Sequence, residues 1–230
     1  MSTTLTLDLG GHSVTIALKR SALARRLSLR IDPAVGPVMV LPQRTSLREA
    51  EKFALANRVW LAERLARLPG RVAFEPGAVV PLLGAGHAIH HEPGARRGVW
   101  LEDGAIKVSG QPDFVARRVG DFLKAEAKRL ILPRAHELAD RIGRKPGRIS
   151  VKDTRSRWGS CSAKGDLAFS WRLVLAPERI LTYVVAHEVA HLAELNHSPA
   201  FWAVVATLTP DHAHARAWLK SHGARLHRYG

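Results

Sequence analysis

The first part of the chain consists of short stretches in which apolar and polar residues alternate. Residues 3–9 and 14–18 alternate in this way on either side of Gly10-Gly11, and residues 27–31 and 38–41 follow as two further apolar stretches. Alternation with a period of two predicts half-buried strands, and a Gly-Gly pair between two of them predicts a hairpin. We therefore expect each of these stretches to be a strand.

A helix is predicted next. Ser46 and Glu49 form an S-x-x-E capping box at its start. The helical pattern runs to about Leu68, and Gly70 ends it. Apolar residues at helical spacing form its inner side: Leu47, Ala50, Phe53, Ala54, Leu61 and Leu65.

Short apolar stretches return over residues 79–108, separated by Gly, Pro and Asp. Their length and their turn residues predict further strands. His87, His90 and His91 lie in one of them, and we interpret them as surface histidines of an exposed strand rather than a second metal site. Residues 1–110 are thus predicted to form a β-rich region around one long helix.

The pattern changes after residue 110, so that we expect an α+β fold with a second, more helical region over residues 111–230. Apolar positions between Phe114 and Leu138 have helical spacing, and Pro133 is expected to kink this helix or to divide it. Residues 149–152 and 167–175 are predicted to be strands. A nearly continuous apolar stretch, residues 180–186, then predicts a helix that is buried on all sides.

Net charge and cysteine content limit the partners and the cellular compartment that we expect for the protein. The net charge of +15 and the pI near 11.1 favour polyanionic partners, nucleic acid above all, or acidic substrates. A solvated basic surface explains the same charge, and no nucleic-acid-binding motif accompanies it. The single cysteine, Cys161, excludes an internal disulfide. With no signal-peptide pattern and no apolar run of membrane-spanning length, we expect a cytoplasmic protein without a membrane contact; the sequence gives no oligomeric state.

The predicted buried helix carries the candidate chemistry. His187, Glu188 and His191 form an H-E-x-x-H motif, and residues four apart share one face of a helix, so both imidazoles can point at one ion. Two histidines and a third ligand leave a fourth tetrahedral position for water, as in catalytic zinc sites. Glu188 is then the candidate general base. Because polar side chains in a buried helix are costly unless they bind a metal or pair, a metal site is favoured over chance.

His197 is the candidate third ligand, provided that the chain turns after about Leu195. Asn196 can adopt the left-handed conformation that such a turn requires, and Ser198-Pro199 supplies an N-cap and a first-turn proline for another helix. Glu194 lies two helical turns from His187 and cannot reach the same ion. Four histidines of the basic C-terminal segment are the alternatives: His212, His214, His222 and His227.

The three-histidine spacing also fits the metzincin pattern H-E-x-x-H-x-x-G-x-x-H. Glu194 occupies the glycine position, however, and both methionines, Met1 and Met39, precede the motif. No methionine turn can follow it, so we exclude a metzincin.

The chain resembles the YgjP-like metallopeptidase family, a relative of the SprT-like zinc proteases. The resemblance rests on R-W-G-S-C-S (157–162), W-R-L (171–173) and Y-V-V-A-H-E-V-A-H-L-A-E-L-N-H-S-P-A-F-W (183–202), and A-R-R-L-S-L-R-I (24–31) resembles the first half of that family. Ser170 departs from the Asn expected before W-R-L. The resemblance implies a zincin-like metallopeptidase domain over 111–230, in which His187, His191 and His197 bind Zn²⁺ and Glu188 is the general base.

Two interpretations of R-W-G-S-C-S stay open. The run can lead an edge strand beside the metal, to which an extended peptide adds by β-augmentation, or Trp158 and Cys161 can pack beneath the metal helix. We interpret Cys161 as a structural thiol. An oxyanion-stabilising group is also required, and its candidates are Arg155, Arg157, Tyr183 and the C-terminal histidines.

Together these features predict a zinc-dependent metallopeptidase that hydrolyses a peptide or protein substrate. The alternative is a basic nucleic-acid-associated protein whose zinc site is structural, or which acts only on proteins bound to nucleic acid.

Overall fold

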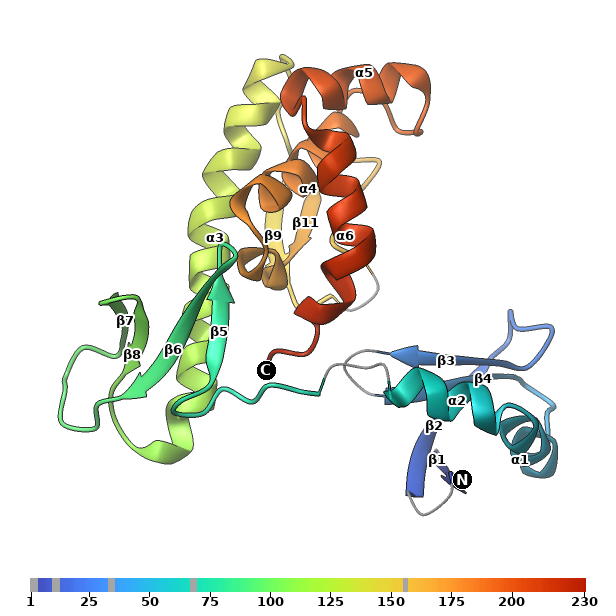
Figure 1. The fold of residues 1–230 in the computed structure, drawn as a ribbon. Helices are drawn as coiled ribbons and strands as arrows, with labels where there is room; N and C mark the ends of the chain where they lie inside the picture. Colours follow the sequence, from blue (N-terminus) through green and yellow to red (C-terminus); the bar gives the residue numbers. More distant parts are fainter. Residues whose placement is uncertain (1–3, 10–12, 33–35, 67–69, 155–156) are drawn as a thin grey trace. The chain divides into compact units, whose positions relative to one another are not determined.

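The protein is described from a computed structural model, in which residues 4–9, 13–32, 36–66, 70–154 and 157–230 are described. The fold is α+β, as the sequence predicts, with small sheets and helices along the chain (Figure 1). Two compact units, Met1–Gly70 and Arg71–Gly230, divide the chain, and each is considered by itself.

The first unit packs helices against a four-stranded sheet. Its strands are β1 (Thr4–Asp8), β2 (Ser13–Ser21), β3 (Ser28–Asp32) and β4 (Gly36–Pro42), in the order β1-β2-β4-β3. Strands β2 and β4 are parallel, and the outer pairs are antiparallel. Ile16 and Met39 of the sheet share a core with Ala50, Ala54 and Leu61 of the helices. This confirms the expected apolar face except at Leu47, which is 47% exposed.

The single helix expected after Ser46 is wrong in one respect, because the structure divides it into α1 (Leu47–Ala56) and α2 (Arg58–Ala66). The capping box is confirmed: the Ser46 hydroxyl accepts from the Glu49 N–H, and the Glu49 carboxylate accepts from the Ser46 N–H at 2.8 Å. The division falls at Asn57, whose side-chain amide donates to the Phe53 carbonyl at 2.8 Å. A side chain that bonds to the backbone in this way competes with helix continuation. The expected end at Leu68 lies outside the described residues.

The second unit begins with another four-stranded sheet. It contains β5 (Val79–Leu82), β6 (Ala85–His91), β7 (Val99–Glu102) and β8 (Ala105–Val108), in the order β5-β6-β8-β7. The tip of the β5–β6 hairpin is bound to the later chain, since the Leu83 N–H donates to the Val174 carbonyl at 2.7 Å. Buried Val80, Ile89 and Ile106 belong to the same core as the C-terminal helices. The division of the chain therefore falls at Gly70 rather than near the expected residue 110.

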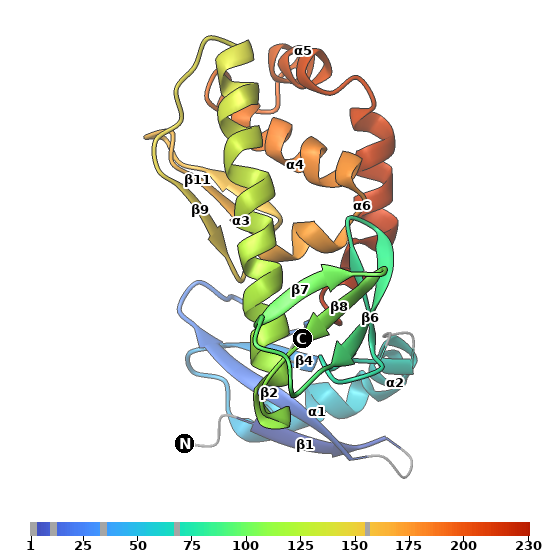
Figure 2. The same ribbon diagram turned by 90° about the vertical axis from the view of Figure 1, so that its left-hand side faces the viewer.

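A long helix and a buried one form the framework of the C-terminal part. A 3-10 turn, η1 (Pro112–Phe114), leads into α3 (Val115–Arg141), and a three-stranded sheet follows in the order β10-β11-β9. Its strands are β9 (Ile149–Lys152), β10 (Gly159–Cys161) and β11 (Leu167–Ser170). Helices α4 (Glu178–Ala190), α5 (Pro199–Leu208) and α6 (His212–Leu226) complete the unit, with α4 between α3 and α6 (Figures 1 and 2).

The expected strand over residues 167–175 is only half correct. Strand β11 ends at Ser170, and W-R-L belongs instead to a buried 3-10 helix, η2 (Trp171–Leu175). The Ser170 hydroxyl accepts from the Arg172 N–H at 3.4 Å and caps this helix. A continuous apolar run cannot by itself distinguish a buried strand from a buried helical turn, which explains the difference.

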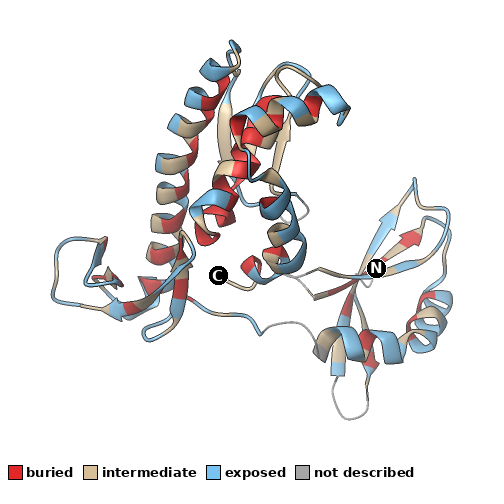
Figure 3. Cartoon of the chain, turned by 45° about the horizontal axis from the view of Figure 1, so that its top comes forward, coloured by how far each residue is buried: buried red, intermediate tan, exposed pale blue. Residues whose placement is uncertain are grey.

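Helix α3 is not divided at Pro133, although division was one of the two outcomes expected there. It runs unbroken over 27 residues, with Pro133 on its exposed side. Ile131 and Ala135, on either side of the proline, are fully buried in the core, and Figure 3 shows the buried positions as a red stripe along this helix. Packing of that stripe holds the helix together despite the missing hydrogen bond. None of the described helices combines the length and the apolar character that a membrane span requires.

Replacing Pro133 by Ala is expected to increase the free energy of unfolding by about 2 kcal/mol. The proline costs a helix interior about 3 kcal/mol, of which up to about 1 kcal/mol is offset by its stiffening of the unfolded chain. Urea unfolding followed by circular dichroism measures the change. Glu137→Ala, at another exposed position of α3, is the control, and a less stable Pro133→Ala variant would contradict the prediction.

Candidate functional site

Helix α4 brings the H-E-x-x-H residues into the core. Pro177 precedes it as the N-cap, and Glu178 places a negative charge in its first turn, where the helix dipole favours it. From Ile180 to Ala190 it is buried almost all round, as the apolar run predicts. His187 and Glu188 lie in its last turn, and His191 is its C-cap residue.

The chain turns immediately after His191, which places His197 beside the helix. The helix tightens as it ends, because the Leu192 N–H donates to the Val189 carbonyl at 2.9 Å and the Ala193 N–H donates to the Ala190 carbonyl at 3.0 Å, each three residues back. The left-handed conformation expected for Asn196 is wrong: among the described non-glycine residues, Leu83 and Asp103 have a positive φ and Asn196 does not. Instead the Asn196 side-chain oxygen accepts from the Ser198 N–H at 3.1 Å, a turn that this side chain forms without backbone strain.

The helix expected after this turn is confirmed. The Ser198 hydroxyl accepts from the Phe201 N–H at 3.3 Å, and Pro199 is the first residue of α5. The sequence thus predicted the cap but not the way in which Asn196 makes the turn.

Three histidines converge at this point, each offering one ring nitrogen within 4.8 Å of the others. The Nε2 atoms of His187 and His197 are 3.1 Å apart. Two nitrogens bound to one tetrahedral zinc ion at about 2.0–2.1 Å lie about 3.3 Å apart, so this spacing fits a shared ion. His191 Nδ1 lies 3.0 Å from the Glu194 carbonyl, which leaves Nε2 as its metal-binding nitrogen. The donor set therefore fits zinc.

Burial favours the neutral form of His187 and His191, which is the form that binds a metal. It lowers the pKa of His187 to about 4, with further lowering by His191, His197 and Arg216, and it also lowers the pKa of His191. Aromatic rings of α5 provide much of the apolar surroundings. The Phe201 ring lies 4.5 Å from that of His191 and 5.0 Å from that of His187, centroid to centroid.

Glu188 lies against the edge strand β10, with only 7% of its surface exposed. A Cβ at Gly159 would lie 2.5 Å from Glu188 Cγ, so a residue with a side chain cannot replace this glycine unless Glu188 moves. Burial raises the pKa of Glu188 to about 7, and the positive charge of Arg157 opposes this shift. A carboxyl group with its pKa near neutrality can both accept and release a proton, as general base and general acid require.

A cleft of about 240 Å³ opens beside Glu188 and His187. Tyr183, one turn before His187, lines it, and burial raises the pKa of Tyr183 so that its hydroxyl stays protonated. The remaining lining residues come from the β10 segment, α4 and α6: Arg157, Trp158, Gly159, Val184 and Leu219. The cleft therefore holds a base, a phenolic donor and a cation next to the three histidines.

Trp158 is fixed on the wall of this cleft. Its ring lies 4.8 Å from that of His227, and a Cβ at Gly223 of α6 would lie 3.2 Å from it. Trp158 thus packs against the core, as one interpretation expected, but its ring contacts are with α6 and His227. Among the described residues β10 pairs with β11 alone, which confirms it as an edge strand. No feature of the sequence indicated the approach of Gly159 to Glu188 or of Gly223 to Trp158.

The other candidates of the sequence lie apart from the three histidines. His212 stacks on Trp202 at 5.9 Å, and His91 Nε2 bonds to the Gly110 carbonyl at 2.6 Å. Burial and the nearby Glu188 raise the pKa of Cys161, which agrees with an unreactive thiol. Among the described residues, no other group of three His, Cys, Asp or Glu side chains converges. Arg155, a candidate for stabilising the oxyanion, lies outside the described residues.

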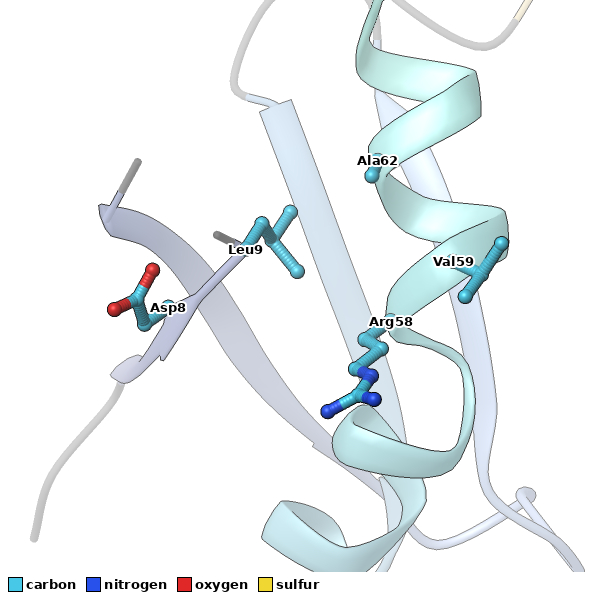
Figure 4. Close-up of a pocket in the computed structure, with 5 residues that line it drawn as sticks. All are labelled: Asp8, Leu9, Arg58, Val59 and Ala62. Carbon is cyan, nitrogen blue, oxygen red and sulfur yellow. The ribbon is translucent and has the colours of Figure 1, made fainter. Parts of the chain in front are cut away.

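A second hollow, of about 390 Å³, lies in the first unit and is lined by Asp8, Leu9, Arg58, Val59 and Ala62. Asp8 and Arg58 lie on opposite sides of it (Figure 4). Among its lining residues Asp8 is the one carboxylate, with no histidine, cysteine or hydroxyl side chain beside it, so the hollow lacks the cluster of ligands or the nucleophile–base pair that metal or nucleophilic chemistry needs.

Comparison with known proteins agrees with the site. The profile of the YgjP-like metallopeptidase domain matches residues 25–222. Among solved structures, the crystal structure of the metallopeptidase zymogen of Pyrococcus abyssi abylysin is similar, with 21% identity over 44% of this chain and 92% of that chain and a TM-score of 0.31. A search of curated proteins gives no match. Neither these findings nor the site supports the alternative of a nucleic-acid-associated protein with a structural zinc site.

His197→Ala is expected to weaken zinc binding by more than about 100-fold, because even residues that only support a ligand contribute about 10- to 100-fold. Competition with a chromophoric chelator measures the affinity. His136→Ala, an exposed histidine of α3, is the matched control and should bind zinc as the unchanged protein does. An unchanged affinity in His197→Ala would place the third ligand elsewhere.

Proposed function

The chain belongs to the YgjP-like metallopeptidase family, and from this premise we propose that it is a zinc-dependent peptidase. His187, His191 and His197 bind the zinc ion, and Glu188 is the general base. The observation that carries this proposal is the convergence of three ring nitrogens within 4.8 Å beside a buried carboxyl group. Bound Zn²⁺ supplies Lewis acidity, which polarises a peptide carbonyl and lowers the pKa of water.

Glu188 moves the proton in this reaction. Its carboxylate accepts a proton from the attacking water and passes it to the leaving amine, which needs a group that titrates near the working pH. The pKa of about 7 that burial imposes on Glu188 supports this role, and a bound cation nearby would favour its ionised form.

Tyr183 is the group that we propose for the oxyanion. Its ring lies 6.0 Å from that of His187, centroid to centroid, and it lines the cleft with Glu188. A phenol that stays protonated can donate a hydrogen bond to the charge that develops on the carbonyl oxygen. Tyr183 is preferred to the C-terminal histidines because none of them lines this cleft.

The substrate is a peptide or a protein segment in an extended conformation. Strand β10 has one unpaired edge and lies against α4, so a substrate strand can add to it and bring a carbonyl toward Glu188. We place the reaction in the cytoplasm, in keeping with a chain that has a single cysteine.

Glu188→Gln is expected to keep zinc and to lose hydrolysis by at least about 1,000-fold, since the amide cannot accept the proton. Zinc content by elemental analysis and the rate of cleavage of a mixture of quenched fluorescent peptides measure the two effects. Glu137→Gln on α3, an exposed carboxyl outside the site, is the control. Full activity in Glu188→Gln would overturn the assignment of the base.

Tyr183→Phe is expected to lower kcat by about 100- to 1,000-fold and to leave KM and zinc content nearly unchanged, as loss of an oxyanion donor does. Steady-state kinetics on one cleaved peptide separates the two constants. Tyr229→Phe, at the other tyrosine of the chain, is the matched control. A change confined to KM would instead make Tyr183 a substrate-binding residue.

A further inference from the structure

Arg157 is held in a defined place at the mouth of the cleft. Its carbonyl accepts from the Thr154 hydroxyl at 2.9 Å. The next residue, Trp158, is fixed by its ring contacts and by its carbonyl, which accepts from the Ser170 N–H at 2.8 Å. The backbone that presents Arg157 is therefore anchored on both sides. Arg157 lines the cleft together with Glu188.

A second arginine, Arg216, lies on α6, on the helix face that borders the cleft, although it does not line the cleft itself. Arg216, Leu219 and Gly223 have the spacing i, i+3 and i+7, which places them on one face of the helix. Leu219 lines the cleft and Gly223 contacts Trp158, so this face is turned toward the site. The Arg216 guanidinium carbon lies 5.2 Å from the centroid of the Trp202 ring, and its charge lowers the pKa of both Tyr183 and His187.

These two positive charges have no carboxylate that balances them. Within the described residues, no ion pair involves Arg157 or Arg216, and Glu188 is the one acid that lines the cleft. The nearby Asp166 is occupied elsewhere, since its side chain accepts from the Arg148 N–H at 2.8 Å. A bound zinc ion would add further positive charge. The cleft therefore has an excess of positive charge beside the proposed base.

An exposed arginine on a basic protein is ordinarily a solvated side chain. Arg157 differs because it lies on the wall of a cleft of about 240 Å³, next to the apolar Val184 and Leu219. Apolar walls reduce the local dielectric and strengthen the pairing of a guanidinium with an anion. A carboxylate is the anion that a peptide itself carries, and it matches the planar guanidinium with two hydrogen bonds.

We infer that Arg157 is a specificity-determining residue, which pairs with a carboxylate of the peptide substrate next to the scissile bond, and that Arg216 strengthens the preference at longer range. This inference rests on the proposed peptidase function. The carboxylate has two sources in a peptide, the side chain of Asp or Glu and the free C-terminus. The first source makes the protein an endopeptidase for acidic segments, and the second makes it a carboxypeptidase.

The test compares peptides of one sequence that differ only in charge. The set carries Glu, Gln or Lys on each side of the scissile bond, with an amidated C-terminus, and a Gln peptide with a free C-terminus is added. Cleavage by the zinc-loaded full chain gives kcat/KM, and fluorescence polarisation with zinc-loaded Glu188→Gln gives the dissociation constant without turnover. Arg157→Gln and Arg216→Gln are measured in both backgrounds, and Arg96→Gln, an exposed arginine between β6 and β7, is the matched control.

We expect a Glu peptide, or the peptide with the free C-terminus, to be preferred over its neutral counterpart by about 10-fold in both measurements. Arg157→Gln should remove this preference, Arg216→Gln should reduce it, and Arg96→Gln should retain it. The preference should also weaken as salt is added, because the pair is partly exposed.

The inference would be overturned, even though peptides are cleaved, if kcat/KM and the dissociation constant were equal for the charged and neutral peptides. A preference for the charged peptide that persists in Arg157→Gln would overturn it as well. If no peptide is cleaved, the proposed function fails, and the binding measurement still decides on Arg157. A matched loss of Glu and Gln peptide binding in Arg157→Gln would show a structural role for this residue and would also overturn the inference.

Discussion

The site depends on the burial of polar side chains in a helix that is apolar almost all round. Glu188 and His187 lie in the last turn of α4, where burial disfavours both of their charged forms: it raises the pKa of the acid to about 7 and lowers that of the imidazole to about 4. An unpaired polar group in such a place costs about 1–3 kcal/mol or more. A cation bound by the three histidines would offset this cost, since it would take up the imidazole lone pairs and favour the carboxylate.

Two glycines transmit the packing of α6 to the carboxyl group of Glu188. Gly223 lets the Trp158 ring lie against α6, and the packed Trp158 fixes the position of the residue before β10. Gly159, the next residue, then lets the β10 backbone approach Glu188. Side chains at either glycine would separate these layers. The position of the proposed base thus depends on Gly223 of α6, more than thirty residues later in the chain, through contacts that need the absence of a Cβ.

Features that depend on residues close in sequence were predicted better than the path of the chain. Spacing predicted that His187 and His191 share one face of a buried helix, and the S-P pair predicted the start of α5. At Asn196 and at W-R-L, a side-chain hydrogen bond and packing in the core overrode the local preference, and Pro133 did not divide α3. Contacts across the fold, such as Gly159 with Glu188 or Gly223 with Trp158, have no local signal.

The sequence also does not show where in the fold the positive charge gathers. A net charge of +15 indicates attraction to anions but not where it acts, and nucleic acid was a reasonable expectation from composition alone. The structure gives part of that charge a location, because Arg157 lines a cleft with one acid, and Arg216 lies on the helix face that also carries the cleft residue Leu219. Positive charge that is placed at an apolar cleft acts on what enters the cleft, whereas the same charge spread over a surface acts weakly on everything. The charge of this protein is therefore best understood through the small part of it that faces Glu188.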